Sequence, residues 1–236
     1  MENIKEDKKT ARIAGFWYLI LGIGYGYGWM LITKVFINGN AVLTAQNIIQ
    51  SGFQYIIGII FTIISLIGFI FLILTLYKLL KRVNENISKI MLTLVLVSIP
   101  ISFTSIIFEI GALVVLKRAD YLSAFSMVQI QSFATLFVNL YIVGSHIAEI
   151  FWGLWLFPFA YLVYKSNFFP KILAILLTIS GISYCIGSIT YLINPIIFTK
   201  ISNILSIPET IGEVSMLLWL LIKGVSIKTS KKGNVA

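Results

Sequence analysis

Four stretches of this chain run for about 20 residues each without a single charged side chain. They are residues 13–33, 54–77, 90–108 and 172–193. A helix needs about 20 apolar residues to cross the hydrocarbon core of a bilayer. Charged residues make up 11% of the 236 positions, against roughly 25% in soluble domains. The sequence therefore predicts an all-α integral membrane protein.

Polar breaks divide the chain into six expected transmembrane helices that form one bundle. The first apolar run, Gly15 to Ile37, is too long for a signal-peptide core and is not followed by a cleavage site, so it predicts an uncleaved first helix. We expect a membrane domain over 13–226, between cytoplasmic tails at 1–12 and 227–236. The six expected helices cover about 13–35, 54–80, 89–116, 136–164, 171–193 and 204–223.

Lysine and arginine are divided unevenly between the two sides of these helices. With the N-terminus inside, fourteen of the eighteen fall on the inner side, and only Lys34, Lys117, Arg118 and Lys200 fall outside. This asymmetry predicts that both ends lie in the cytoplasm and that the protein sits in the cytoplasmic membrane. The net charge of +9 then serves orientation and anionic lipid headgroups, not nucleic acid.

Two uncharged stretches, at about 40–52 and 121–135, are too polar to face lipid along their whole length. Each is expected to form a short amphipathic segment at the outer surface, the first capped by Asn38 or Asn40. For the second, a re-entrant segment or a seventh crossing is the alternative. A seventh crossing would destroy the charge asymmetry.

The first expected helix carries glycine at every second position from 22 to 28. Gly22 with Gly26, and Gly24 with Gly28, are pairs of small residues four apart, which allow another helix to approach closely. A phosphate-binding loop is excluded, because these glycines lie inside a spanning segment. The pattern predicts helix packing, and the packed partner is either internal or a second subunit.

Five ionisable side chains stand in apolar surroundings: Glu109, His146, Glu149, Glu209 and Glu213. A charge at the bilayer centre costs at least about 2.5–3.5 kcal/mol on insertion scales. Such residues normally face the bundle interior or a wet cavity.

Helical spacing places each of these residues on a polar line. Ser98, Ser102, Ser105 and Glu109 share one face of the third expected helix. Similar lines join Asn139, His146, Glu149 and Gly153 in the fourth helix, and Ser202, Ser206, Glu209 and Glu213 in the sixth. If these helices are neighbours, we expect one polar cavity in the outer half of the bundle.

Three interpretations of such a cluster stay open. The carboxyls could be hydrogen-bonded structural groups, or they could form a binding or translocation site in which Glu and His titrate. They could also form a metal site, catalytic or not, around His146 and Glu149, completed by Glu109 and Glu213. The H-E-x-x-H pattern of zinc hydrolases is absent, and the single cysteine, Cys185, excludes an intrachain disulfide.

Tryptophans and tyrosines are expected in interfacial belts and not in a cofactor pocket, because most of them fall near expected helix ends. The residues assigned in this way are Trp17, Trp29, Trp152, Trp155, Tyr161, Tyr164 and Trp219.

Several segments together resemble a bacterial family of multi-pass membrane proteins, domain of unknown function 4386. They are ARIAGFWYLI at 11–20, NAVLTAQNIIQSGFQYIIG at 40–58, ADYLSAFS at 119–126, the run from Ile150 to Tyr184, and PETIGEVSMLLWLLIKGV at 208–225. The resemblance implies a helical membrane bundle and no particular activity. It also places Gly153 in a family-like segment, as a further packing glycine.

We therefore expect a non-enzymatic membrane role: binding or transport of a small molecule linked to protons, or a structural or regulatory role. An intramembrane metal-dependent enzyme using the Glu/His cluster is the alternative. No cofactor is expected. The expected partner is the lipid bilayer, while a small ligand and a homo-oligomer stay open.

Overall fold

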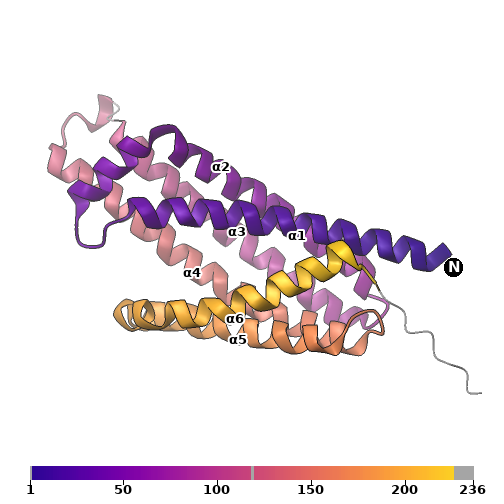
Figure 1. Cartoon of the computed structure of the whole chain (residues 1–236). Helices are drawn as coiled ribbons and strands as arrows, with labels where there is room; N and C mark the ends of the chain where they lie inside the picture. The colour runs from indigo at the N-terminus through magenta and orange to yellow at the C-terminus, as the bar shows by residue number, and fades with distance from the viewer. Residues whose placement is uncertain (1, 118–119, 226–236) are drawn as a thin grey trace, which may run out of the picture.

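A computed structural model describes residues 2–117 and 120–225, and the regular structure in them is entirely helical (Figure 1). Six of its helices are long and apolar enough to cross a membrane, which confirms the predicted class. In chain order they are α1 (Glu2–Val35), α2 (Ala41–Leu80), α3 (Glu85–Leu116), α4 (Met127–Lys165), α5 (Lys171–Ile193) and α6 (Pro195–Ile222), with a 3-10 turn at Asp120–Leu122 between α3 and α4.

The helices extend further than apolar length alone predicts. α1 begins at Glu2, so the described part of the expected tail 1–12 is helical. α6 begins at Pro195 because the side chain of Asn194 accepts hydrogen bonds from the next free N–H groups, those of Ile196 and Ile197, at 3.0 and 3.2 Å. Proline is well suited to such a first turn. The expected tail 227–236 lies outside the described residues.

Residues 41–51 of the first polar stretch and residues 127–135 of the second become parts of longer helices, while 121–126 form a 3-10 turn and a loop. Residues 41–51 form the first turns of α2, before a break at Gly52, whose φ of 45° is a left-handed value that favours glycine. Asn40 caps this piece, accepting from the Leu43 N–H at 2.9 Å. Residues 127–135 do not form a separate helix, since α4 begins with a capping box at Ser126 and continues through them. The described residues include no seventh helix of membrane length.

Each helix packs mainly on its neighbours in sequence, and α6 closes the bundle against α1. α2 also touches α4, and five leucines of α2 are buried, namely Leu66, Leu72, Leu76, Leu79 and Leu80. The predicted polar line of α3 faces inward: Ser98, Ser102, Ser105 and Glu109 are all buried. The three serines donate to backbone carbonyls of their own helix, so burial leaves their hydroxyl protons bonded.

Glycines set the distance between several helix pairs. A Cβ atom at Gly24 would lie 2.6 Å from the Phe61 carbonyl oxygen, and one at Gly153 would lie 2.8 Å from the Gly181 carbonyl oxygen. Gly28 likewise meets Thr62 and Gly58 of α2. These contacts use small residues for close backbone approach, and their partners lie within this chain.

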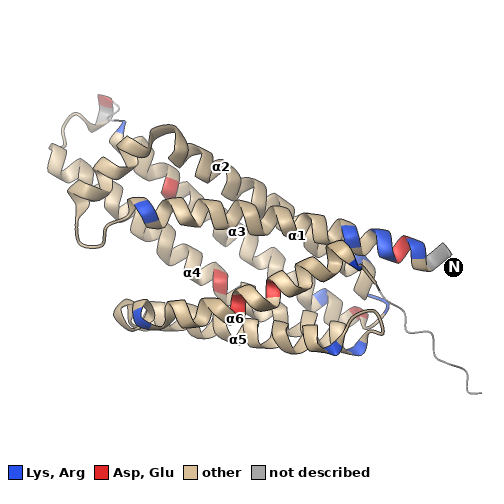
Figure 2. Cartoon of the chain, in the orientation of Figure 1, with Lys and Arg blue, Asp and Glu red and all other residues tan. Residues whose placement is uncertain are grey.

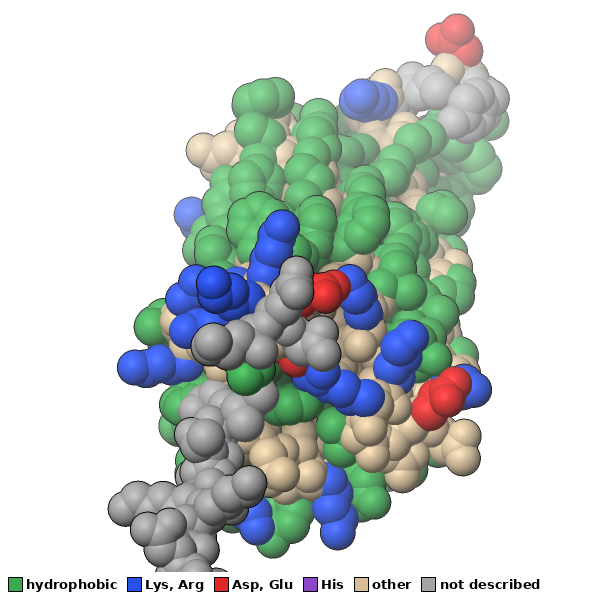
Figure 3. All heavy atoms as spheres, turned by 90° about the vertical axis from the view of Figure 1, so that its right-hand side faces the viewer, with side chains coloured by type: hydrophobic (Ala, Val, Ile, Leu, Met, Phe, Trp, Pro, Cys, Tyr) green, Lys and Arg blue, Asp and Glu red, His purple; other side chains and the backbone are tan. Residues whose placement is uncertain are grey.

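Lysine and arginine gather at the end of the bundle that holds the N-terminus (Figure 2). Figure 3 looks at this end directly and shows basic side chains across it, with hydrophobic side chains above them. The distribution agrees with the charge asymmetry in the sequence. That this end faces the cytoplasm stays a prediction.

Candidate ligand-binding site

The structure separates the five ionisable residues into two places. α3 packs on α2 and α4, whereas α6 packs on α5 and α1. Glu109 of α3 is not among the residues that line the pocket shared by Glu209 and Glu213 of α6. Glu209 and Glu213 line one pocket, and Glu149 approaches α5 at Ser188, next to Gly187, which Glu209 approaches. His146 is bonded to Glu149. The expected cluster thus loses Glu109.

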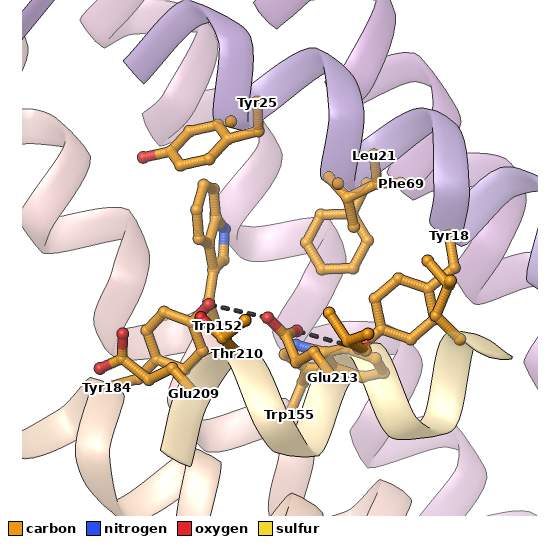
Figure 4. Close-up of a pocket in the computed structure, with 14 residues that line it drawn as sticks. Tyr18, Leu21, Tyr25, Phe69, Trp152, Trp155, Tyr184, Glu209, Thr210 and Glu213 are labelled. Carbon is orange, nitrogen blue, oxygen red and sulfur yellow. Dashed lines mark hydrogen bonds between the residues drawn. The ribbon is translucent and has the colours of Figure 1, made fainter. Parts of the chain in front are cut away.

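Glu213 is held by two tyrosines from different helices. The Tyr184 hydroxyl of α5 donates to Oε2 at 2.7 Å, and the Tyr18 hydroxyl of α1 donates to Oε1 at 2.9 Å. Figure 4 shows the two hydroxyls on either side of the carboxylate. α6 is anchored to α5 just beside this point, because the Ser180 hydroxyl lies 2.8 Å from the Pro208 carbonyl oxygen. The position of Glu213 is therefore fixed by α1, α5 and α6 together.

Beside Glu213 is a cavity of about 280 Å³. Exposed Gly22 and Gly26 of α1 form one rim, and exposed Thr210 and Val214 of α6 form the other. A Cβ atom at either glycine would meet nothing within 4 Å. The cavity therefore opens sideways between α1 and α6, toward the lipid. Its lining consists of Tyr18, Leu21, Gly22, Tyr25, Gly26, Phe69, Trp152, Trp155, Tyr184, Glu209, Thr210, Glu213, Val214 and Leu217.

Only two of the four α1 glycines therefore have the expected packing role. Gly24 and Gly28 pack on α2, while Gly22 and Gly26 leave the opposite face of α1 hollow. Closer to the N-terminus the same two helices touch, since a Cβ atom at Gly15 would lie 2.7 Å from the Leu221 nitrogen. α1 and α6 therefore meet at one end and leave space between them further along.

Aromatic side chains form most of the cavity wall. The Tyr25 ring meets Trp152 edge-on with centroids 4.6 Å apart, and the Phe69 ring meets Trp155 in the same manner at 5.5 Å. Both tryptophans are buried, so their assignment to an interfacial belt was wrong. Both lie in the middle part of α4 (Met127–Lys165), where they line the cavity together with side chains of α1 and α6.

His146 and Glu149 form a second polar pair on α4. Nδ1 of His146 lies 2.6 Å from Oε2 of Glu149, and the Ser188 hydroxyl of α5 approaches the same oxygen at 3.5 Å. The imidazole is covered by Tyr191, with ring centroids 3.8 Å apart. Within residues 2–117 and 120–225, no three His, Cys, Asp or Glu side chains come together in a way that could hold a metal ion. The predicted metal site has no third ligand here.

Glu209 lines the cavity one helical turn before Glu213. Its Oε1 atom is directed toward α5, where a Cβ atom at Gly187 would be 4.0 Å away. In the part of the chain that the structure describes, neither Glu209 nor Glu213 forms an ion pair. The cavity therefore holds two acidic groups without a matching base.

The residues that complete this site were missed in the sequence. Tyr18, Gly22 and Tyr25 lie at i, i+4 and i+7, one face of a helix, and Gly26 extends that face. This spacing is visible in the sequence, but the alternating glycines predicted only packing there. No pattern in the sequence pairs Tyr18 with Tyr184, which lies 166 positions later and belongs to α5.

A bundle of six membrane-length helices, with an aromatic pocket that contains two carboxyl groups, defines a multi-pass membrane protein. The chain belongs to the family described as "Domain of unknown function (DUF4386)", whose sequence profile matches residues 13–224. A relative from the archaeon Archaeoglobus fulgidus, called "Uncharacterized protein", is 30% identical over 171 residues, 69% of this chain and 85% of its own length. No solved structure matches the chain significantly.

Proposed function

We propose that this protein binds a small lipophilic cation in the cavity between α1 and α6, with Glu213 as its counter-charge and with protons as competitors. The observation that carries the proposal is Glu213 itself: a carboxylate at the wall of an aromatic cavity, fixed by two hydroxyl donors and paired with no described base. Transport or regulation would follow from such binding.

Charge is the first argument. A carboxylate removed from water is strongly disfavoured unless it is paired or neutralised. The hydroxyls of Tyr18 and Tyr184 offset part of this cost but supply no positive charge. A bound cation or a bound proton would complete the compensation. Proton and ligand would then compete for one group.

The wall of the cavity is the second argument. Cations bind over the faces of tryptophan, tyrosine and phenylalanine, with gains of about 0.5–2 kcal/mol for each ring. Trp152, Trp155, Tyr25 and Phe69 surround the space next to Glu213 (Figure 4). An organic ammonium group fits this combination of rings and carboxylate better than a neutral or anionic ligand does.

The side opening is the third argument. Because the rim formed by Gly22 and Val214 faces the bilayer, a ligand would enter from the lipid phase. That route favours an ammonium group attached to an apolar body. The proposed place of binding is the cytoplasmic membrane, with the basic end of the bundle inside.

A matched pair of ligands tests the proposal. Benzyltrimethylammonium carries the charge, and neopentylbenzene has the same shape without it. Calorimetry on the detergent-purified protein should show saturable binding of the cation, and the neutral compound should fail to displace it. Glu213→Gln keeps the side-chain size and should weaken cation binding roughly 100-fold, since losing one partner of a desolvated charge pair costs about 2–5 kcal/mol.

A second variant locates the ligand. Gly22→Leu would place a side chain in open space at the rim and should abolish binding without loss of helix content. Ile23→Leu, at the adjacent exposed position, is the matched control. Equal affinity for the charged and neutral compounds, or full binding in Gly22→Leu, would refute the proposed site.

A further inference from the structure

The N-terminal part of α1 carries a second feature, which the cavity does not involve. α1 has 34 residues, about 51 Å at 1.5 Å per residue, while the hydrocarbon core is about 30 Å thick. Its first turns therefore extend beyond the hydrocarbon into the headgroup region. These turns hold most of the charges of the helix.

The charges on these turns are sorted by face. Glu6 lies 3.5 Å from Lys78 of α2, and Asp7 pairs with Arg82, two residues after the end of α2. The basic residues Lys5, Lys8, Lys9 and Arg12 occupy positions i, i+3, i+4 and i+7, which form one continuous stripe. All four are exposed. The face toward α2 is thus neutralised by these ion pairs, and from residue 4 to residue 12 the other face holds only basic charges.

This basic stripe borders a surface hollow of about 460 Å³. Its lining consists of Lys5, Lys8, Lys9, Arg12, Ile13 and Phe16. Ile13 and Phe16 are 41% and 51% exposed, so an apolar step lies directly below the charges, at the point where α1 enters the membrane. Among the side chains that the structure describes, none forms an ion pair with any of the four cations.

We infer that this hollow binds the headgroup of an anionic phospholipid, with the phosphate among Lys5, Lys8 and Lys9 and an acyl chain along Ile13 and Phe16. Charge and shape both support a lipid over a free phosphate, because only a lipid uses the apolar step. Arg12 serves the fold instead, because its guanidinium donates to the Ile222 carbonyl oxygen at 3.2 Å and ties α1 to the end of α6.

The surroundings favour an anion over competing protein groups. Figure 3 shows that this end of the molecule is predominantly basic. Basic residues close to an anionic leaflet each contribute about 1 kcal/mol of attraction, which is roughly a factor of five in affinity.

Native mass spectrometry on the full-length protein tests this inference. The wild type should retain phosphatidylglycerol in preference to phosphatidylcholine, and glycerol 3-phosphate, which lacks acyl chains, should not be retained. The triple variant Lys5→Gln, Lys8→Gln and Lys9→Gln should lose affinity for phosphatidylglycerol by roughly 100-fold. Arg12 is left unchanged because of its bond to α6.

A control with the same change in net charge separates a local site from general attraction. Lys81→Gln, Lys165→Gln and Lys171→Gln remove three exposed cations elsewhere on the same end and should reduce affinity less than fivefold. Lys5→Arg, Lys8→Arg and Lys9→Arg should keep binding and show that the segment tolerates substitution. Equal losses of phosphatidylglycerol affinity in the two glutamine triples would overturn the inference, and so would the absence of a preference for phosphatidylglycerol. Retention of glycerol 3-phosphate would also overturn it, because it would indicate a site for free phosphate.

Discussion

Glu213 and Glu109 both carry a carboxyl group on an apolar helix, but they differ in hydrogen bonding and in accessibility. Glu213 accepts two tyrosine hydroxyls and faces an open cavity. Glu109 is 3% exposed, and its Oε2 atom has no hydrogen-bond partner among the described residues. The Tyr55 hydroxyl is also buried without a described partner. An acidic residue in a membrane helix is thus not by itself a sign of a binding site.

Packing explains the difference. α3 is enclosed by α2 and α4 and buries its polar line, whereas α6 buries only Gly212, Met216, Leu217 and Leu220. A tightly enclosed carboxyl leaves no room for a ligand and is tolerated most easily in its neutral form. A carboxyl on a loosely packed helix can be reached. The accessible acid, not the most buried one, is the better functional candidate.

The largest expected effect separates the two acids by ligand affinity. Glu213→Gln should weaken benzyltrimethylammonium binding roughly 100-fold, while Glu109→Gln should change it less than twofold, because Glu109 does not line the cavity. Titration calorimetry on both variants measures this contrast. If Glu109→Gln weakened cation binding more than Glu213→Gln did, Glu109 and not Glu213 would be the acid that binds the ligand.

Proton competition should give the next largest effect. If a proton and the cation share Glu213, affinity should fall by up to tenfold for each pH unit below the point where the carboxylate takes up its proton. The dissociation constant, measured across a pH series, should show this slope in wild type and in Glu109→Gln. A flat profile in wild type would argue against a shared group.

Leucine substitutions should separate the two acids by stability. Glu109→Leu removes an unpartnered polar atom and should leave the protein equally stable or up to about 2 kcal/mol more stable. Glu213→Leu deprives the hydroxyls of Tyr18 and Tyr184 of their acceptor and should cost about 1–3 kcal/mol. Thermal unfolding in detergent compares the variants. Equal losses at both positions would mean that Glu109 has a partner after all.

The smallest effects are expected from single tyrosine hydroxyls. Tyr184→Phe removes one hydrogen bond to Glu213 and should cost about 0.6 kcal/mol, the average for hydrogen-bonded pairs inside a membrane protein, and at most about 1.7 kcal/mol. Tyr55→Phe, the matched change beside α3, should be neutral, since its hydroxyl has no described partner. The same unfolding assay resolves the two, and a loss at Tyr55 as large as at Tyr184 would contradict the assignment.

Sequence patterns predicted the local features of this fold well. Hydrophobic length gave six helices, and helical spacing predicted the inward line from Ser98 to Glu109, because both depend on neighbouring residues alone. Helix ends were harder, since Asn194 and Ser126 start α6 and α4 through capping bonds that hydropathy does not register.

Only part of the candidate site could be predicted from the sequence, because the site combines residues from helices far apart in the chain. Helical spacing located Glu209 and Glu213, but the tyrosines that bond Glu213 come from α1 and α5. Their meeting depends on which helices pack together and on where glycines bring α5 close to α4 and α6. Long-range packing of this kind leaves no periodic trace in a single sequence.

The bonds between Glu213 and the two tyrosines also bear on how the protein is made. α1 and α5 are synthesised before α6, so the hydroxyl groups of Tyr18 and Tyr184 are already in the membrane when α6 inserts. A helix with two carboxylates inserts poorly alone. Hydrogen-bond donors on the helices inserted earlier would make the insertion of α6 more favourable. Deleting α1 should therefore leave α6 incompletely inserted, which a glycosylation tag placed after Lys223 would reveal.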